Sequence, residues 1–341
     1  MKAYAELHAH SCWSLREGAS STDELIDRAT ALGYPAMALT DHDNLYGAME
    51  YARAARERGL KPITGCELTV RDNGAGRSEP DPSLPDGQPS PASHLTVLAR
   101  DVEGYRNLCR LLSRAYRVHG KDAPVVEREW LFEHNAGLIV LSGCTGSELA
   151  RLATTNPQRA ASLAAEYRDT FGDRFFIELQ HHDVFGDTAR VDALAAVAER
   201  CALEVIATNN VHYHVRTRHR LNDVLVAVRH RLTLDSSHRE RRPNSEFFLK
   251  SAEEMARRFE RYPRAISNTL AIAEQCAFDL TRDLPYRLPD YPVPDGATPD
   301  SFLRGVCERA FHRKYPPTDP FATEARDRLD RELALIAKHG L

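Results

Sequence analysis

The sequence predicts an α/β protein built on a barrel of strands, with a helical extension at its C-terminal end. Two observations lead to this prediction. Short apolar runs rich in β-branched residues alternate with amphipathic stretches of helical period, which is the pattern of repeated βα units. Six or seven such units in about 215 residues imply parallel strands and favour a closed barrel over an open sheet.

The first element is the segment YAELHAH at residues 4–10. Side chains alternate between two faces of an extended strand, so His8 and His10 would point the same way and could hold one ligand between them. Six further strands are expected from apolar runs at residues 36–40, 62–70, 95–99, 138–142, 175–179 and 204–208.

Amphipathic helices are expected between these strands, and the first is the best marked. Residues 21–24 form a capping-box pattern, and Gly33 supplies a stop. The apolar residues between them share one face: Leu25, Ile26, Ala29 and Leu32. Two more helices are expected near the C-terminus, at residues 300–313 and 320–339.

Two segments interrupt this rhythm. Residues 71–93 contain five prolines and three glycines, so we expect a flexible surface loop inserted between two strands. The proline-rich residues 284–299 mark the end of the main domain, which gives a barrel over residues 1–283 and a linker with helices over residues 284–341. The chain stops one residue after Gly340, where a helix cap would normally lead onward, so we expect a piece of a longer protein.

Net charge, apolar runs and cysteine spacing limit the kinds of partner and the cellular location that we expect. The formal net charge is −4, so any contact with nucleic acid must come from a local patch. Residues 216–242 hold eight arginines against three acidic residues, although a solvated helix face is the simpler interpretation. We expect a cytoplasmic protein without a membrane partner, because the sequence contains neither a secretory leader nor a long apolar run. The seven scattered cysteines include no C-x-x-C pair, which argues against a disulfide framework.

Potential ligands lie at or near the C-terminal ends of five expected strands, the edge at which barrel enzymes build active sites. They are Asp41 and His42, Glu67, Cys144, His181 and His182, and Asn210 and His212. His94 begins its strand and fits this pattern less well. Each residue alone has an ordinary explanation as a buried or paired side chain. Their joint occurrence, together with His8 and His10, indicates a metal site.

This set is too large for one ion, because zinc takes about four ligands. We therefore expect two or three divalent ions, and the mixed imidazole, carboxylate and thiolate ligands leave zinc, manganese and iron open. Ions bridged by a carboxylate can activate water and stabilise the attacking and leaving oxygens of a phosphoester. Phosphoester hydrolysis is the chemistry that the residues alone favour.

Six motifs together resemble the PHP domain (polymerase and histidinol phosphatase). They are H-x-H at residues 8–10, T-D-H at 40–42, G-x-E at 65–67, H-L-T-V-L-A from His94, S-G-C at 142–144 and T-N-x-x-H-Y at 208–213. The stretches ARDVEGYRNLCRLLSRAY and AEQCAFDL are similar to the PHP domain of bacterial C-family DNA polymerases, and ATNNVHYH is similar to their error-prone branch.

This resemblance implies a distorted (β/α)7 TIM-like barrel with a trinuclear metal centre at the strand ends. The implied ligands are His8, His10, Glu17, His42, Glu67, His94, Cys144 and His212, with Glu67 bridging two ions. Asp41 would orient a ligand, and His182 would lie near a substrate phosphate. Asn210 stands at a further ligand position where active members carry aspartate. An amide ligates only through a neutral oxygen, so metal affinity should fall.

The implied activity is metal-dependent hydrolysis of phosphodiesters by a 3′-to-5′ exonuclease. The implied partners are DNA, as a single strand or a primer 3′ end, and the remaining polymerase domains. The polymerase palm would follow residue 341, so we expect no DNA synthesis by this chain. Two alternatives stay open: a metal-stabilised structural module without catalysis, which Asn210 favours, and a histidinol-phosphatase-like phosphomonoesterase, which Cys144 disfavours.

Overall fold

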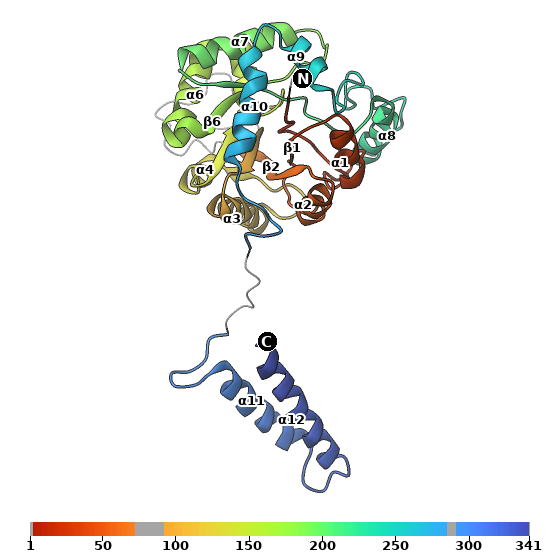
Figure 1. The fold of residues 1–341 in the computed structure, drawn as a ribbon, viewed down its shortest axis with the longest axis vertical. Coiled ribbons are helices and arrows are strands. Elements are labelled where there is room, and N and C mark those ends of the chain that lie inside the picture. Colours follow the sequence, from red (N-terminus) through yellow and green to blue (C-terminus); the bar gives the residue numbers. More distant parts are fainter. Residues whose placement is uncertain (1–2, 72–91, 285–290, 341) are drawn as a thin grey trace. The chain divides into compact units, whose positions relative to one another are not determined.

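The computed structural model describes residues 3–71, 92–284 and 291–340 (Figure 1). The chain divides into two compact units, Met1–Leu284 and Pro285–Leu341. Almost all of the loop expected at residues 71–93 lies outside the described residues, as do residues 285–290 of the expected linker.

The first unit is built on one sheet, in which the strand order is β1-β2-β3-β5-β6-β7 and β4 pairs with β2. The strands are β1 Ala36–Leu39, β2 Lys61–Arg71, β3 Ser93–Ala99, β4 Val126–Glu127, β5 Leu138–Leu141, β6 Phe175–Leu179 and β7 Val205–Ala207. The six strands expected from apolar runs are confirmed, and the short β4 was not expected.

One strand runs against the others. β3 is antiparallel to both β2 and β5, so the expectation of an all-parallel sheet is wrong at this strand. In an antiparallel pair the start of one strand lies beside the end of its partner. Thr96 accordingly pairs with Leu141 at the end of β5. His94, two residues before Thr96, therefore lies at the same edge as the C-terminal ends of the parallel strands.

The N-terminal segment closes the sheet into a barrel. On one side, Ala38 N and Thr40 N donate to Glu6 O and Ala9 O, each at 2.8 Å. On the other side, His10 N donates to Val211 O at 2.8 Å. Residues 4–10 form isolated bridges here and no regular strand. With the six strands of the main order they complete a distorted seven-membered ring, as the resemblance implied.

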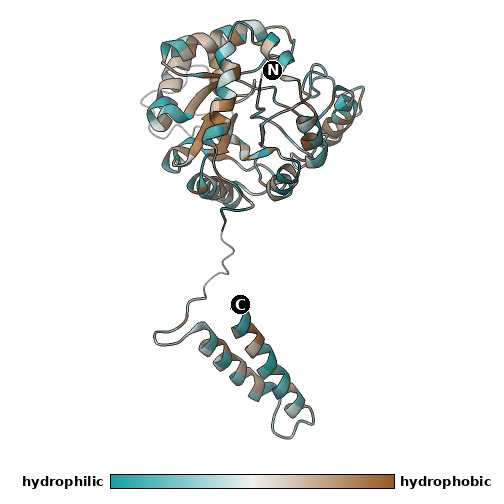
Figure 2. Cartoon of the chain, viewed as in Figure 1, coloured by the Kyte–Doolittle hydropathy of each residue, from teal (hydrophilic) through white to brown (hydrophobic). Residues whose placement is uncertain are grey.

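Helices surround this ring (Figure 1). They are α1 Thr22–Ala31, α2 Ala48–Glu57, α3 Val102–His119, α4 Arg128–Glu133, α5 Glu148–Thr155, α6 Pro157–Phe171, α7 Asp187–Arg200, α8 His219–His230, α9 Ala252–Arg258 and α10 Pro263–Gln275. The capping box of Ser21 and Glu24 at the start of α1 is confirmed. Hydropathy follows this layering, because the strands are the most apolar elements and the helices carry polar outer faces (Figure 2).

Every second residue of a strand faces the inside of the barrel, so the inward-facing side chains form layers. One layer is apolar, and the next layer toward the site edge is polar. The apolar level contains Ala38, Leu98, Leu141, Phe176 and Ile206, which belong to one buried cluster with Ile272 of α10. Two residues further toward the site edge, the same inward-facing positions hold Thr40, Thr96, Gly143, Glu178 and Thr208. The fold therefore places a polar floor beneath the edge where the candidate ligands lie.

The second unit contains α11 Pro299–Lys314 and α12 Ala322–His339, close to the two expected helices. Arg326 of α12 packs over Phe311 of α11 and pairs with Glu308 at 2.6 Å. All seven cysteines are free. Among the described residues, no helix combines the length and the apolar character that crossing a membrane requires.

We expect a chain that ends at Leu284 to keep the fold of the first unit, because the buried clusters of the barrel and its helices lie within it. Its thermal unfolding midpoint should stay within about 2 °C of the midpoint measured for the full chain. Circular dichroism on heating measures this. A larger drop would show that residues 285–341 stabilise the barrel.

Candidate metal centre

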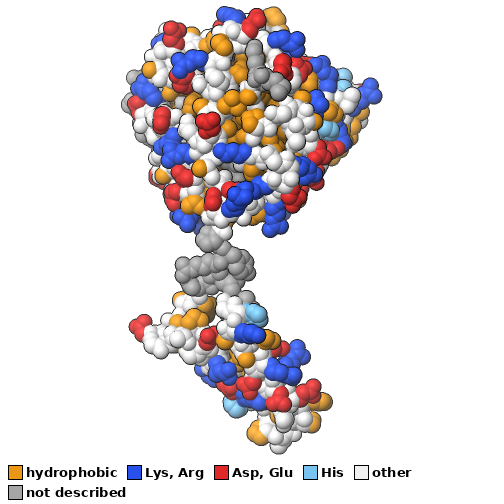
Figure 3. Space-filling model, viewed as in Figure 1, with side chains coloured by type: hydrophobic (Ala, Val, Ile, Leu, Met, Phe, Trp, Pro, Cys, Tyr) orange, Lys and Arg blue, Asp and Glu red, His pale blue; other side chains and the backbone are white. Residues whose placement is uncertain are grey.

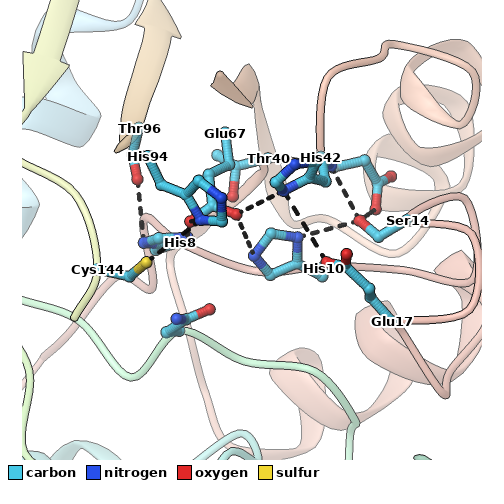
Figure 4. Close-up of polar contacts among 12 residues, drawn as sticks. His8, His10, Ser14, Glu17, Thr40, His42, Glu67, His94, Thr96 and Cys144 are labelled. Atoms are coloured by element: carbon cyan, nitrogen blue, oxygen red, sulfur yellow. Dashed lines mark hydrogen bonds and ion pairs between the residues drawn. The ribbon is translucent and has the colours of Figure 1, made fainter. Parts of the chain in front are cut away.

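Glu67 lies at the centre of a buried cluster of histidines (Figure 4). Its Oε1 is 3.2 Å from His8 Nε2 and 3.4 Å from His94 Nδ1. Its Oε2 is 2.9 Å from His42 Nδ1 and 3.7 Å from His10 Nε2. The described residues contain two groups that could each hold an ion: His8, His10 and Glu67, and His42, Glu67 and His94. Glu67 belongs to both groups, and its bridging of two ions stays a prediction.

The fold brings these residues together from separate elements. His42 follows β1, and Glu67 lies within β2. His94 is the second residue of β3, and Cys144 follows β5. The apparent exception of His94 in the sequence is explained by the reversed direction of β3, which puts the start of that strand at the site edge.

Gly143 allows the end of β5 to lie directly against His94. Its φ is +87°, a backbone conformation that side chains with a Cβ rarely adopt. A Cβ atom at this position would also lie 2.0 Å from the carbonyl oxygen of His94. The glycine of the S-G-C motif is therefore required for the close approach that places Cys144 beside His94.

Glu178 fixes the orientation of His8 from below. His8 Nδ1 is 2.7 Å from Glu178 Oε1, and a carboxylate accepts, so Nδ1 carries a hydrogen and Nε2 is the nitrogen that faces Glu67. Glu178 also accepts from Gln180 at 2.8 Å and from Gly143 N at 3.1 Å. Burial alone would raise the pKa of Glu178, but the charge and hydrogen bond of His8, together with hydrogen bonds from Thr208 and Gln180, lower this pKa.

Asp41 acts on His10 through Ser14. The Ser14 hydroxyl donates to Asp41 Oδ1 at 2.6 Å, so its oxygen accepts from His10 Nδ1 at 3.0 Å. Asp41 also accepts from the backbone N of Ser11 at 2.7 Å. The lone pair of His10 Nε2 is thereby aimed at Glu67. Asp41 and Ser14 therefore lie where they can orient His10, and the orienting role of Asp41 stays a prediction.

Glu67 and three of the histidines around it favour their charged forms although burial disfavours charge. Burial would raise the pKa of Glu67, but the surrounding imidazoles, led by His94, keep it well below its usual value. Burial would lower the pKa values of His8, His42 and His94, but nearby carboxylates raise each of them to about 10. For His10, burial dominates and lowers the pKa. Protons and cations therefore compete for the same imidazole nitrogens.

Several polar atoms of the cluster are buried and make no hydrogen bond. They are His8 Nε2, His10 Nε2, Glu67 Oε1 and Asn210 Oδ1. Buried polar atoms are nearly always satisfied, so a group of them facing one point needs an explanation. Imidazole nitrogens and carboxylate oxygens are also the ligand atoms that zinc, manganese and iron accept. The residues present fit a site for divalent ions.

Two of the expected ligands lie at the edges of the cluster. Glu17 Oε2 is 3.9 Å from His42 Nδ1, and Glu17 Oε1 forms an ion pair with Arg229 of α8. Cys144 Sγ is 3.5 Å from His94 Nδ1, and burial raises the pKa of its thiol. Both side chains are placed to join the His42 and His94 group.

His212 and Asn210 lie on the opposite side, next to His10. The ring centres of His212 and His10 are 4.3 Å apart. His212 Nδ1 donates to Asn210 O at 2.8 Å, and Arg242 donates to His212 Nε2. Burial lowers the pKa of Arg242 to about 10, so its guanidinium stays charged at neutral pH. Asn210 adopts a φ of +42°, which asparagine tolerates better than most residues.

His182 is buried against Phe247 and does not face the Glu67 cluster through any contact among the described residues. The ring centres of His182 and Phe247 are 3.9 Å apart, and His182 Nε2 donates to Asn209 O at 2.9 Å. The side chain is 1% exposed. Its expected place near a substrate phosphate stays a prediction. The neighbouring His181 lies near Asp183 and Arg258 instead.

Sequence reasoning missed three residues that act on the cluster: Ser14, Glu178 and Arg242. The sequence did contain an indication of Glu178, because this carboxylate interrupts the apolar run FFIEL. A charged side chain in a buried strand needs polar partners. Ser14 had no such indication, since its role depends on a hydrogen bond to Asp41, which lies 27 residues away in the sequence. Arg242 was noted only as part of an arginine-rich segment.

The sequence is similar to those of known proteins. The chain matches the PHP domain family over residues 6–182. It is 39% identical over 341 residues to the error-prone DNA polymerase of Mycobacterium tuberculosis strain H37Rv, covering 98% of this chain and 30% of that protein. It is 37% identical to the DNA polymerase III subunit alpha of Thermus aquaticus, covering 99% of this chain and 28% of that protein. The chain thus spans about 30% of the length of these curated relatives.

Two solved structures share the fold outline at lower similarity. One is an amidohydrolase from Chromobacterium violaceum, with a TM-score of 0.39 and 19% identity. The other is a protein from Bifidobacterium adolescentis described as a proposed metal-dependent phosphoesterase, with a TM-score of 0.41 and 16% identity. Each match covers 62% of this chain and 88% of the other.

His182 should make the protein sensitive to acid. Burial lowers its pKa from 6.5 to about 3, so between these values the unfolded chain binds a proton that the folded chain does not. The free energy of unfolding should therefore fall as the pH is lowered, by about 2 kcal/mol between pH 7 and pH 5 from this group alone.

Urea unfolding of the wild type and of His182→Gln at several pH values tests this expectation. The glutamine amide can still donate to Asn209 but does not titrate, so the variant should lose that part of the pH dependence. His181→Gln, at the more exposed neighbouring position, is the matched control. Equal slopes for wild type and His182→Gln would contradict the assignment.

Proposed function

Because the chain belongs to the PHP domain family, we propose that the Glu67 cluster binds divalent metal ions and hydrolyses phosphoesters. The observation that carries this proposal is the position of Glu67, whose two oxygens each face two imidazoles. One ion would be held by His8, His10 and Glu67, and a second by His42, His94 and Glu67. Glu17 and Cys144 would complete the second group.

Ions bound in this way supply Lewis-acid activation of water and neutralise the charge of a phosphate. The protein's own contribution is orientation. Glu178 holds His8, and Ser14 with Asp41 holds His10, so the ligand nitrogens are fixed before any ion binds. Zinc, manganese and iron each remain compatible with imidazole, carboxylate and thiolate ligands.

We further propose that the substrate is a phosphodiester of DNA, cleaved from a 3′ end. The relatives named above are DNA polymerases, in which a site of this kind would act beside a primer end as a 3′-to-5′ exonuclease. DNA and the remaining domains of such a polymerase are the proposed partners. Polymerisation is not assigned to this chain. On the face drawn in Figure 3, Lys and Arg are interspersed with Asp and Glu, so that face offers no continuous basic track for DNA.

A second function is favoured by one observation. Asn210 places a neutral amide next to His212, and its buried Oδ1 makes no hydrogen bond. A site that lacks a carboxylate at this corner has less negative charge with which to hold ions. The cluster would then bind metal for stability alone, and the barrel would act as a structural module of a polymerase.

The number of metal ions bound per chain tests whether the Glu67 cluster binds metal. Protein purified without chelator should contain at least two ions per chain by elemental analysis, and Glu67→Gln should lower this number below one because both groups share Glu67. Glu57→Gln changes an exposed glutamate of α2 and is the matched control. Metal-free wild-type protein would end the proposal.

The same preparations, supplied with manganese or zinc, should release nucleotides from the 3′ end of a labelled single-stranded oligonucleotide. Glu67→Gln should reduce this rate at least a hundredfold, on the order of 3 kcal/mol. Activity that persists in Glu67→Gln would come from a contaminating nuclease. Bound metal with no hydrolysis in any preparation would favour the structural module.

Asn210→Asp should strengthen metal binding. The new carboxylate adds a negative charge beside His212, and we expect about tenfold higher affinity for manganese, or about 1.4 kcal/mol. Calorimetric titration of metal-stripped protein measures this. Asn156→Asp makes the same chemical change at a helix cap, where both residues are accepted, and should have no effect. Unchanged affinity in Asn210→Asp would show that this position does not contact an ion.

A further inference from the structure

One arginine enters the cluster from a segment that supplies none of the ligands proposed above. Arg242 follows α8, and its guanidinium carbon lies 4.5 Å from the ring centre of Phe247. It donates to His212 Nε2, and its own Nε is buried without a hydrogen bond. Glu67 and Cys144 lie close enough to act on it electrostatically. A fixed positive charge therefore lies within the candidate centre.

The hydrogen bonds of His212 determine which of its nitrogens carries the proton. Nδ1 faces the carbonyl oxygen of Asn210 at 2.8 Å, and a carbonyl only accepts, so Nδ1 carries the hydrogen. The lone pair is then on Nε2. A guanidinium has donors only, so Arg242 takes that lone pair. A metal ion needs the same lone pair, and the two cannot share it.

The position of the guanidinium adjoins the first ion group. His212 lies 4.3 Å, ring centre to ring centre, from His10. Among the described residues, the two groups that share Glu67 are the ones able to hold an ion, and neither includes His212. A cation bound at His212 would lie against Arg242, where like charges repel strongly because water is excluded.

We propose that the guanidinium of Arg242 takes the place of a third metal ion, so that the centre binds two ions and His212 is not a ligand. This inference rests on the proposed metal binding. It departs from the trinuclear centre and the ligand role of His212 that the sequence led us to expect. Arg242 supplies the positive charge of that corner from the chain itself.

Counting ions tests the proposal. Metal-stripped protein is saturated with manganese, excess metal is removed by gel filtration, and bound ions per chain are measured by elemental analysis. The wild type should bind two. Arg242→Ala frees His212 Nε2 and should bind three, while the matched control Arg241→Ala, whose partly buried side chain pairs with Asp223 of α8, should stay at two.

Three further variants keep the result interpretable. Arg242→Met retains an apolar side chain over Phe247 and removes only the charge, so it should also bind three ions if Arg242→Ala unfolds. His212→Ala in the wild-type background should still bind two, whereas His8→Ala should bind fewer.

The inference is overturned if the wild type binds three ions and His212→Ala loses one. It is also overturned if folded Arg242→Ala and Arg242→Met both stay at two; in either case the proposed metal binding stands. A wild type that binds no manganese would instead refute the proposed function itself.

Discussion

The buried charge of Glu67 is the constraint around which the site is organised. Its side chain is nearly inaccessible to water, and a carboxylate in such a place is costly unless it is paired. Four imidazoles surround it, and three of them are held in the protonated state by nearby carboxylates. The result is an arrangement in which one anion and several nitrogen ligands share a small volume. Divalent cations would supply positive charge to the same carboxylate and bind the same imidazole nitrogens.

The segment that closes the barrel also supplies two of the candidate metal ligands. The segment 4–10 bonds to β1 on one side and to the backbone of Val211 on the other, and it carries His8 and His10. Without that closure the first ion group would lose both of its histidines. The reversed β3 makes the matching contribution on the other side, since it places His94 at the end of β5. Stability of the ring and integrity of the centre are therefore linked.

The polar floor of the barrel gives the centre its rigidity. Glu178 holds His8 from within the ring, and Asp41 acts through Ser14 to hold His10. Such contacts fix ligands before an ion binds and lower the conformational cost of binding. Arg242 adds a positive charge on the side of His212, where the neutral Asn210 would hold a cation poorly. The asymmetry between the two sides of Glu67 follows from these few residues.

Six of the seven strands, the first helix and the set of residues at the site edge could be predicted from the sequence alone. These depend on local periodicity, capping and the alternation of side chains, which can be read along the chain. The sequence did not determine the direction of β3, and for that reason His94 looked out of place. It also gave no weight to Ser14 or Arg242, because their roles depend on Asp41 and His212, which lie 27 and 30 residues away in the sequence. Only the tertiary structure decided which nitrogen of each histidine faces Glu67 and which faces a neighbour, because hydrogen bonds between distant elements fix each ring.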